Sequence, residues 1–546
     1  MSDATFDALL AQAARHGRHV AVIDGHRRIP LARLDREATI LAAALAAQGT
    51  RPGDRVAVAM TSGADALACF FAVLRAGAAA VLVSPQAPEA VLRRILTAAK
   101  ASALIADAAA GAAQDAITSV LRHDHGAAEA RTATISASFT SATITSATSP
   151  PSPPASGPGP GGVAAIFCTT GTTGEPRTVL HTHGGLVASV RALDAAHRSY
   201  FRGAPPDVAA RLLRMAWRYR GRLRSAVGRQ TWLTPMPFHT IGGLRFMTQA
   251  VLSGHRLVVM PRFHPRALIE TVGEHRVSVL ALTPTMLEAV LAVRSVAGAD
   301  LSSLLVVGLG SAPASAGLIS RAEQVLGCPV LNGYGSTETA GGILATRIGD
   351  AGDGSVGYPL PGAEVKVVDD AGNPVAPGTV GELLCRTGSL MAGYGDLPAP
   401  PPRGWHRTGD LALVDGRGAV HIVGRSRDLI IRGGTKIVPV SVENALLEDP
   451  AVAAASVVGI ADPLAGERIV AFVVARAGGD LRPADVLAGC RARLAAQEMP
   501  DHLFVVPDLP VAESGEVRKV ELRSAASRLL TRARPQEENA VEVHRR

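Results

Sequence analysis

The chain has 546 residues, of which 47% are hydrophobic and 19% charged, so it is long enough to form two or more domains with large cores. Aromatic residues make up only 3%, which argues against a surface that stacks nucleic-acid bases. The net charge of +8 is modest for this length and favours anionic small molecules, or weak contact with a membrane surface, over nucleic acid.

Neither a disulfide framework nor a targeting segment is expected. The five cysteines lie far apart, and no two have the spacing of a metal site or a redox motif. The sequence begins without the basic and apolar regions of a signal peptide, and no apolar run reaches transmembrane length. We therefore expect a soluble, cytoplasmic protein, whose oligomeric state the sequence does not reveal.

Helical and strand patterns alternate through residues 1–107. We predict helices over 36–48 and 64–75, and strands over 55–59 and 79–83. This alternation is typical of an α/β fold with a doubly wound parallel sheet.

The alternation stops at residues 108–162, which are rich in Ala, Ser, Thr, Pro and Gly and are predicted to be a disordered, low-complexity insertion. A second irregular stretch contains a basic helix over 211–224. This helix either meets lipid headgroups or nucleotide phosphates, or is simply a solvated surface helix.

An apolar strand over 163–167 leads into a loop of glycines and threonines that ends at Arg177. Gly171 and Gly174 allow the backbone N–H groups to point inward, and the threonine hydroxyls and Arg177 add donors and a positive charge. Taken alone, the loop is either a polar turn between two strands or a cradle for a triphosphate.

The α/β pattern resumes at Thr231 and continues to about Val423, with short antiparallel strands predicted over 364–368 and 380–386. A smaller α+β unit follows, with strands near 455–459 and 469–475 and a helix over 483–494. The charged tail over 526–546 is predicted to be loose.

Seven motifs, read in chain order, resemble those of the adenylate-forming superfamily, which includes acyl-CoA synthetases, peptide-synthetase adenylation domains and luciferases. They lie at 169–178, 235–243, 310–313, 332–338, 404–410, 424–428 and 433–439. The resemblance implies a large N-terminal domain over 1–424, with doubly wound sheets and a small β subdomain, and a mobile C-terminal domain over 425–525. It also implies ATP and Mg²⁺ as cofactors.

The resemblance assigns roles in the large domain. His239 stands beside the carboxylate that is activated, Thr337 contacts phosphate, and Glu338 binds Mg²⁺, a cation that prefers carboxylate and phosphate oxygens. The remaining residues of these motifs hold the triphosphate and the adenine: Thr169, Thr170, Gly171, Thr172, Thr173, Gly174, Arg177, Gly310, Ser311, Ala312, Asn332, Gly333, Tyr334 and Gly335.

Further along the chain, the resemblance implies that Asp410 and Arg425 hold the ribose. Arg427 takes the pivot position between the domains. Gly434 and Lys436 match a segment that lines the pantetheine tunnel in members that use CoA.

One position departs from the family pattern. The family has a lysine near its C-terminal end that reaches the substrate carboxylate and the α-phosphate, and here the matching residue is Glu516. Losing such a contact costs about 10²–10³ in rate. Arg518 or Lys519 is expected to substitute for it, or else adenylation is slow.

We therefore predict an ATP-dependent acid–CoA ligase that acts on a fatty or aromatic acid. The alternatives are an adenylating ligase with another acceptor, such as an amine, and an adenylation-impaired pseudoenzyme. The sequence does not show which acid is activated. Five glycines fall where the walls of the acid's pocket are expected: Gly242, Gly243, Gly308, Gly341 and Gly342. They indicate either room for a bulky acyl group or ordinary turns.

Overall fold

The structure is a computed structural model that describes residues 4–15, 19–107, 159–170, 176–199, 228–293, 296–348, 350, 353–395, 397–398, 404–476, 481–511 and 517–542. Several predicted features lie outside these residues: residues 108–158 of the insertion, the loop 171–175, the basic stretch over 211–224, and Glu516. The chain forms two compact units: unit 1 is Met1–Glu364 with Arg386–His406, and unit 2 is Val365–Cys385 with Arg407–Arg546.

Unit 1 contains two mixed sheets. Nine strands form the first, in the order β14 (Tyr358–Pro359), β13 (Gly341–Ala345), β12 (Val330–Ser336), β11 (Val306–Leu309), β10 (Val279–Leu282), β8 (Thr231–Thr234), β9 (Arg256–Val259), β1 (Val20–Asp24) and β2 (Arg27–Pro30). Seven strands form the second, in the order β18 (Leu397–Pro398), β17 (Gly393–Tyr394), β7 (Pro176–Thr182), β6 (Val163–Thr170), β4 (Ala79–Leu82), β3 (Arg55–Ala59) and β5 (Ala103–Ala106).

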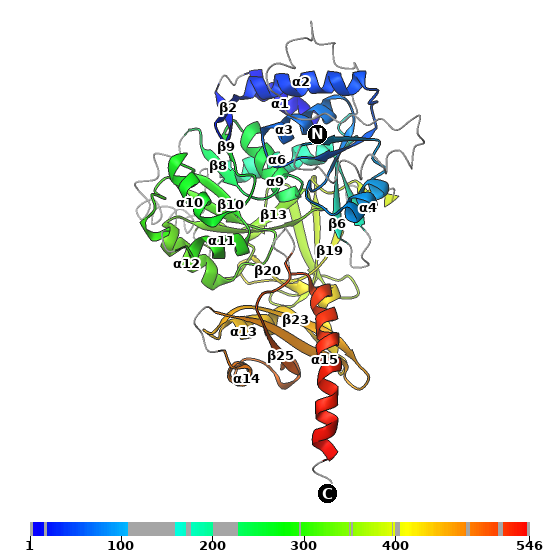
Figure 1. Ribbon diagram of the computed structural model, residues 1–546, viewed down its shortest axis with the longest axis vertical. Helices are drawn as coiled ribbons and strands as arrows, with labels where there is room; N and C mark the ends of the chain where they lie inside the picture. Colours follow the sequence, from blue (N-terminus) through cyan, green and yellow to red (C-terminus); the bar gives the residue numbers. More distant parts are fainter. Residues whose placement is uncertain are drawn as a thin grey trace. The chain divides into compact units, whose positions relative to one another are not determined.

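Helices cover both faces of these sheets. One hydrophobic cluster joins the two sheets to five helices: α1 (Phe6–Arg15), α2 (Leu31–Ala47), α3 (Ala64–Arg75), α6 (His183–Ser199) and α9 (Ile241–Leu252). A second cluster joins the opposite face of the nine-stranded sheet to α10 (Pro265–Glu274), α11 (Pro284–Leu291) and α12 (Ala316–Leu326), which lie together in Figure 1. A third joins the opposite face of the seven-stranded sheet to α4 (Glu89–Ala99).

These layers arise because side chains alternate between the two faces of each strand. In β3, Val56 and Val58 belong to the central cluster, whereas Ala57 and Ala59 belong to the cluster beneath α4. Because side chains point alternately to the two faces of a strand, a continuously apolar strand serves two cores at once. The predicted α/β class is confirmed, and β3 and α3 have the predicted bounds.

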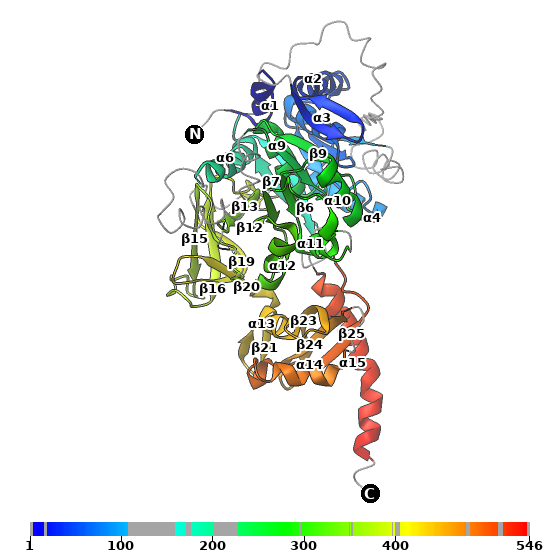
Figure 2. The same cartoon turned by 90° about the vertical axis from the view of Figure 1, so that its left-hand side faces the viewer.

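Unit 2 contains most of a small four-stranded sheet, formed by β15 (Ala363–Val368), β16 (Gly381–Thr387), β19 (His406–Val414) and β20 (Val420–Arg425), which Figure 2 shows side by side. Its other sheet has β22 (Thr435–Ile437), β21 (Ile430–Arg432), β24 (Gly466–Ala475) and β23 (Val452–Asp462), with β25 (His502–Val506) paired to β24. Two helices pack against this sheet, α13 (Pro439–Leu447) and α14 (Pro483–Cys490).

The end of the chain corrects the prediction of a loose tail. Residues Lys519–Glu542 form one helix, α15. Leu522 and Ala526 on this helix are buried with Phe472 of β24, and Leu529 and Leu530 pack against the same cluster. Apolar residues at spacings of three and four keep one face of a charged helix on the sheet, so the start of the predicted tail is part of the core.

Two helix bounds also differ from prediction. Helix α2 begins at Leu31, directly after Pro30, and buries Leu31 and Leu34, so it starts before the predicted residue 36. The helix predicted over 483–494 ends at Cys490. Among the residues described, no helix is both long and apolar enough to cross a membrane.

Candidate active site

The motif segments of unit 1 gather at one edge of the nine-stranded sheet. Strands β8, β10, β11 and β12 are parallel neighbours. The segments 235–243, 310–313 and 336–339 follow the carboxyl ends of β8, β11 and β12. In open α/β sheets this edge is where ligands bind, so sequence spacing and sheet topology place the candidate residues together.

The segment after β8 turns sharply into α9. Thr240 is the N-cap of α9, and its hydroxyl accepts a hydrogen bond from the Gly243 N–H at 3.1 Å. A Cβ on Gly243 would lie 2.0 Å from the Pro237 carbonyl oxygen, so only glycine fits this turn. The half-buried His239 therefore stands immediately before the N-terminus of a helix, where the dipole favours a negative charge.

The segment after β11 is strained. Ser311 has a φ of +70°, although it is not a glycine. A Cβ on Gly242 would lie 3.7 Å from the Ser311 Oγ, which shows that the start of α9 and the 310–313 turn face each other. Gly310 and Ala312 are half-buried and Ser311 is exposed. Strain of this kind is concentrated at functional sites.

The turn that carries Thr337 and Glu338 joins β12 to β13. Thr339 ties it together, because its hydroxyl accepts from the Ser336 N–H at 2.9 Å and donates to the Gly341 carbonyl oxygen at 2.7 Å. Ala340 has a φ of +54°. A Cβ on Gly335 would lie 2.1 Å from the Gly341 carbonyl oxygen, so the two strands are too close for any other residue there.

Glu338 is held as an ionised carboxylate. Its Oε1 accepts a hydrogen bond from the Tyr394 hydroxyl at 2.9 Å. Burial alone raises the pKa of this carboxyl, but hydrogen bonds from its own backbone N–H, Tyr394 and Ser336 outweigh burial, and the pKa lies below its usual value. Burial and the neighbouring Glu338 raise the pKa of Tyr394, so the phenol remains a donor.

A buried histidine fixes the other side of the turn. His181 of β7 has its Nε2 at 2.7 Å from the Thr337 carbonyl oxygen. Burial lowers the pKa of His181 to about 4, so the ring is neutral at pH 7 and Nε2 carries the proton that it donates. Tyr394 lies on β17, which pairs with β7, so one strand pair supports both Thr337 and Glu338.

The predicted phosphate loop is the connection of a β hairpin. Strands β6 and β7 are antiparallel, with Thr169 opposite Arg177 and Thr170 opposite Pro176. The Arg177 guanidinium lies 5.9 Å from the centre of the Tyr394 ring, on the side chain that holds Glu338. The loop itself, with Gly171, Thr172, Thr173 and Gly174, lies outside the described residues.

Asn332 and Tyr334, two of the residues predicted to contact the adenine, differ in how far they are exposed to solvent. Asn332 is buried and donates its side-chain amide to the Ser355 carbonyl oxygen at 2.9 Å, so in this structure it supports the chain around 355. Gly333, Tyr334 and Gly335, which lie further along β12, are half-buried. Asn332 therefore holds the strand, and Tyr334 is the better placed of the two to meet a base.

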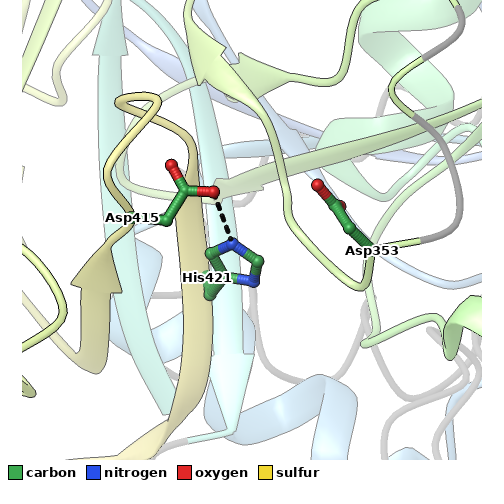
Figure 3. Close-up of side chains that lie close together, drawn as sticks. All are labelled: Asp353, Asp415 and His421. Carbon is green, nitrogen blue, oxygen red and sulfur yellow. Dashed lines mark hydrogen bonds and ion pairs between the residues drawn. The ribbon is translucent and has the colours of Figure 1, made fainter.

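In unit 2, Asp410 and Arg425 face each other across the β19–β20 hairpin. They are register partners, and the Arg425 Nε lies 3.1 Å from the Asp410 Oδ1. The far end of the hairpin is closed by Asp415, which accepts hydrogen bonds from the backbone N–H groups of Arg417 and Ala419. Its Oδ2 also lies 3.4 Å from the His421 Nε2, a contact that joins the two side chains in Figure 3. The pairing of these strands thus sets the two predicted ribose ligands together.

The structure places three further predicted cations of unit 2, Lys436, Arg518 and Lys519, in ion pairs. The Lys436 Nζ lies 2.7 Å from the Asp370 Oδ2, with both side chains exposed, and Gly434 beside it has a φ of +82°. The Lys519 Nζ is 2.8 Å from the Glu443 Oε1 and mostly buried, whereas Arg518 pairs with Glu521 on the surface. Lys519 is therefore engaged inside unit 2 in this structure.

Close contacts favour the second alternative, ordinary turns and close packing, for two of the five glycines that were expected at the pocket wall. Gly243 is required by the Pro237 turn, and a Cβ on Gly341 would lie 2.4 Å from the Arg245 Cδ. Of the five glycines expected at the pocket wall, Gly308 alone has no atom within 4 Å of its Cβ position. Part of the expected pocket wall is thus occupied by the side chain of Arg245.

Sequence reasoning missed Tyr394, His181 and Arg245. No local pattern marks them, because each acts through a residue far away in the chain: Glu338, Thr337 and Gly341 respectively. The only signal for Tyr394 was its place in a short Gly-Tyr-Gly segment, which is not distinctive by itself.

A sheet edge of this construction, with an ionised glutamate after β12, is that of an adenylate-forming enzyme. Residues 9–395 match the model of the AMP-binding enzyme family, and residues 441–516 match that of the AMP-binding enzyme C-terminal domain. The chain belongs to the AMP-binding enzyme family, which makes it an AMP-forming ligase that binds ATP.

Full-length relatives agree with this assignment. Feruloyl-CoA synthase of an Amycolatopsis species is 32% identical over 523 residues, which cover 93% of this chain and 96% of that protein. ATP-bound MatB from Rhodopseudomonas palustris has a TM-score of 0.82 at 25% identity, over 96% and 99% of the two chains. The amide bond synthetase McbA from Marinactinospora thermotolerans has a TM-score of 0.79 at 26% identity, over 95% and 99%.

Proposed function

We propose that this protein is an ATP- and Mg²⁺-dependent acid–CoA ligase. The observation that carries the proposal is the Glu338 carboxylate, kept ionised by Tyr394 at the carboxyl edge of the parallel strands. It is supported by the similarity over nearly the whole chain to feruloyl-CoA synthase.

The residues around Glu338 fit a magnesium ion. Mg²⁺ is typically held by one or two carboxylates together with substrate phosphates, and the low pKa of Glu338 keeps such a ligand charged at neutral pH. When bound, the ion neutralises charge on the phosphate oxygens. The chain's own contribution is to hold the Glu338 carboxylate still through Tyr394, and the Thr337 backbone through His181.

The reaction has two steps. In the first, a carboxylate oxygen of the acid forms a bond to the α-phosphorus of ATP, and the bond to pyrophosphate breaks. In the second, the CoA thiol, having lost its proton, attacks the acyl carbon and AMP leaves. We assign His239 to the acid, Thr337 and Arg177 to phosphates, Tyr334 to the adenine, Asp410 and Arg425 to the ribose, and Gly434 and Lys436 to pantetheine. Catalysis of this kind rests on positioning and charge stabilisation.

Acid-dependent release of pyrophosphate tests the first step. Purified protein is incubated with ATP, Mg²⁺ and a panel of fatty and aromatic acids, first without CoA and then with it. We expect at least one acid to stimulate release, and Glu338→Gln to reduce that rate by about 10²–10³. A panel in which no acid stimulates release would refute the proposal.

A second candidate is a ligase whose acceptor is an amine instead of CoA. The similarity to the amide bond synthetase McbA favours it. Mass spectrometry of reactions supplied with both CoA and a simple amine separates the two, because an acyl-CoA product supports the first function and an amide supports the second.

Glu516 motivates a third possibility, a protein with impaired adenylation. Because Lys519 is paired with Glu443 and Arg518 with Glu521, neither cation is held ready to replace the missing lysine. We therefore expect Glu516→Lys to raise the rate of pyrophosphate release, by up to about 10²–10³. An unchanged rate in this variant would mean that another group already supplies the charge.

A further inference from the structure

Arg245 lies on α9, in the helix that follows His239, and its side chain runs along the first residues of β13. A Cβ on Gly341 would be 2.4 Å from its Cδ and 3.1 Å from its Nε, and a Cβ on Gly342 would be 3.8 Å from its Nη1. The guanidinium thus occupies space that side chains at these two glycines would otherwise fill. This space lies directly after the turn that carries Glu338.

The hydrogen bonding of this guanidinium is incomplete. Its Nε donates to the Ser189 Oγ at 2.8 Å, and Ser189 in turn donates to the Ala340 carbonyl oxygen at 2.8 Å. Its Nη2 is shielded from solvent and has no hydrogen-bond partner among the residues that the structure describes. One side of the group is therefore fixed by the fold, and the other side carries a donor that no described group uses.

The charge is also uncompensated. Burial lowers the pKa of Arg245 to about 10, so it remains positive at neutral pH, and Asp194 is the acid that acts on it electrostatically. The Asp194 Oδ1 instead accepts hydrogen bonds from the Gln249 Nε2 at 2.6 Å and the Ser253 Oγ at 2.9 Å. Within the described part of the chain no carboxylate forms an ion pair with Arg245. A buried cation that has no ion-paired carboxylate among the described residues is strongly unfavourable, so an anion bound at this point would stabilise the site.

We propose that the acid activated by this protein carries a second carboxylate, and that Arg245 binds it. The proposal rests on the proposed function, because it takes the first carboxylate to lie beside His239. Arg245 lies four residues into α9 from Ile241, a rise of about 6 Å, and His239 lies two residues before the helix, so the two residues that would hold the ends of such an acid are separated along the chain direction of α9. A planar guanidinium with a free edge is suited to hold a carboxylate at the far end of a chain of several carbons.

Matched pairs of acids test this assignment. Hexanoate is compared with hexanedioate, and cinnamate with 4-carboxycinnamate, by the kcat/KM of pyrophosphate release. We expect the diacid of each pair to be preferred. Arg245→Met should lower kcat/KM for the diacids by roughly 30- to 1000-fold, mainly through KM, and leave the monoacids unchanged or improved. Arg245→Lys should retain part of the preference.

Arg256→Met is the control for nonspecific damage. Arg256 also has a buried nitrogen without a partner, its Nε, but it is the first residue of β9, at the amino end of that strand. Its replacement should change stability without changing the ratio of diacid to monoacid rates.

A binding measurement makes the test independent of turnover. Hexanedioate should raise the unfolding midpoint of the native protein more than hexanoate does, and Arg245→Met should remove that difference. If no acid releases pyrophosphate, the proposed function fails, and this binding difference still decides the role of Arg245. If monoacids and diacids are equal in both assays, or Arg245→Met lowers the rates of all acids equally, then Arg245 only braces Ser189 and the proposal is overturned.

Discussion

At the scale of single residues, the candidate site is defined by how the turn after β12 is held. Glu338 is an acid whose hydrogen bonds outweigh its burial, and His181 is a base whose burial keeps it neutral. One supplies a fixed negative charge, and the other supplies a donor without adding positive charge beside it. Such opposite shifts of the pKa values of an acid and a base at one turn are typical of functional sites.

The hydroxyl of Tyr394 is expected to set the acid limit of activity. In Tyr394→Phe the Glu338 carboxylate loses one donor, its pKa rises, and it is protonated at a higher pH than in the native protein. We expect the acidic limb of the kcat/KM profile for pyrophosphate release to move to higher pH, with about tenfold lower kcat/KM at neutral pH. Tyr358→Phe, on β14, is the control. A profile that does not move would contradict the role given to Tyr394.

His181 is expected to make unit 1 less stable in acid. Its folded pKa of about 4 lies below the ordinary histidine pKa of 6.5, so between these values the unfolded chain binds more protons. The free energy of unfolding should therefore fall as the pH falls through this window, by about 1.4 kcal/mol per pH unit for this residue. His181→Gln keeps a donor for Thr337 and should flatten the slope.

Tryptophan fluorescence can follow this unfolding, because Trp232 and Trp405, the tryptophans among the described residues, both fall in unit 1. Burial also lowers the pKa of His183, so the slope in His181→Gln is reduced and does not vanish. The control is His26→Gln, at an exposed turn between β1 and β2. Equal slopes in the native protein and in His181→Gln would refute the assignment.

At the scale of elements, the sequence predicted those helices and strands whose bounds are specified by a local pattern of apolar residues and turns. The bounds of β3 and α3 follow from an apolar run bounded by turns and from an apolar helical segment, both visible without the fold. The segments 310–313 and 336–339 were found because they are continuous motifs. Their gathering at one edge follows from the parallel order of β8, β10, β11 and β12.

Contacts between distant segments could not be predicted in this way. The position of Arg245 depends on Gly341 in another strand, and the position of Tyr394 depends on the pairing of β17 with β7. The start of α15 was missed because the apolar residues Leu522 and Ala526 are spaced among charges, and only the sheet of β23 and β24 shows that they are core. In each case tertiary packing supplied the information.

Leu522 tests the role of α15. It is 3% exposed, so Leu522→Ala should lower the free energy of unfolding of unit 2 by about 3 kcal/mol through lost burial and a cavity. Val520→Ala on the same helix is the control: that side chain is 55% exposed, and its loss should change stability by less than about 0.5 kcal/mol.

Hydrogen exchange of β24 is the measurement, because this strand is buried beneath α15. Exchange that follows unfolding of unit 2 should become about a hundredfold faster in Leu522→Ala and stay nearly unchanged in Val520→Ala. Similar exchange in the two variants would show that α15 does not contribute to the core.

At the scale of the whole molecule, the two units offer separate reporters for ligands. Unit 1 contains the turn that carries Glu338, the 310–313 turn and the β6–β7 hairpin, together with Trp232 and Trp405, the tryptophans among the described residues. The β24 amides report on unit 2. A ligand that binds the folded state stabilises it by an amount set by its concentration relative to Kd, whatever the rate of turnover.

ATP with Mg²⁺ is therefore expected to stabilise unit 1 even if Glu516 makes adenylation slow. At a free ATP concentration of about 100 times Kd, the free energy of unfolding measured by tryptophan fluorescence should rise by about 2.7 kcal/mol. GTP, which has the same triphosphate and a different base, should have a smaller effect, and Glu338→Gln should weaken the part that depends on Mg²⁺. If saturating ATP left the unfolding of unit 1 unchanged, the assignment of the nucleotide to this edge of the sheet would be wrong; a full ATP effect without turnover would instead locate the defect at Glu516.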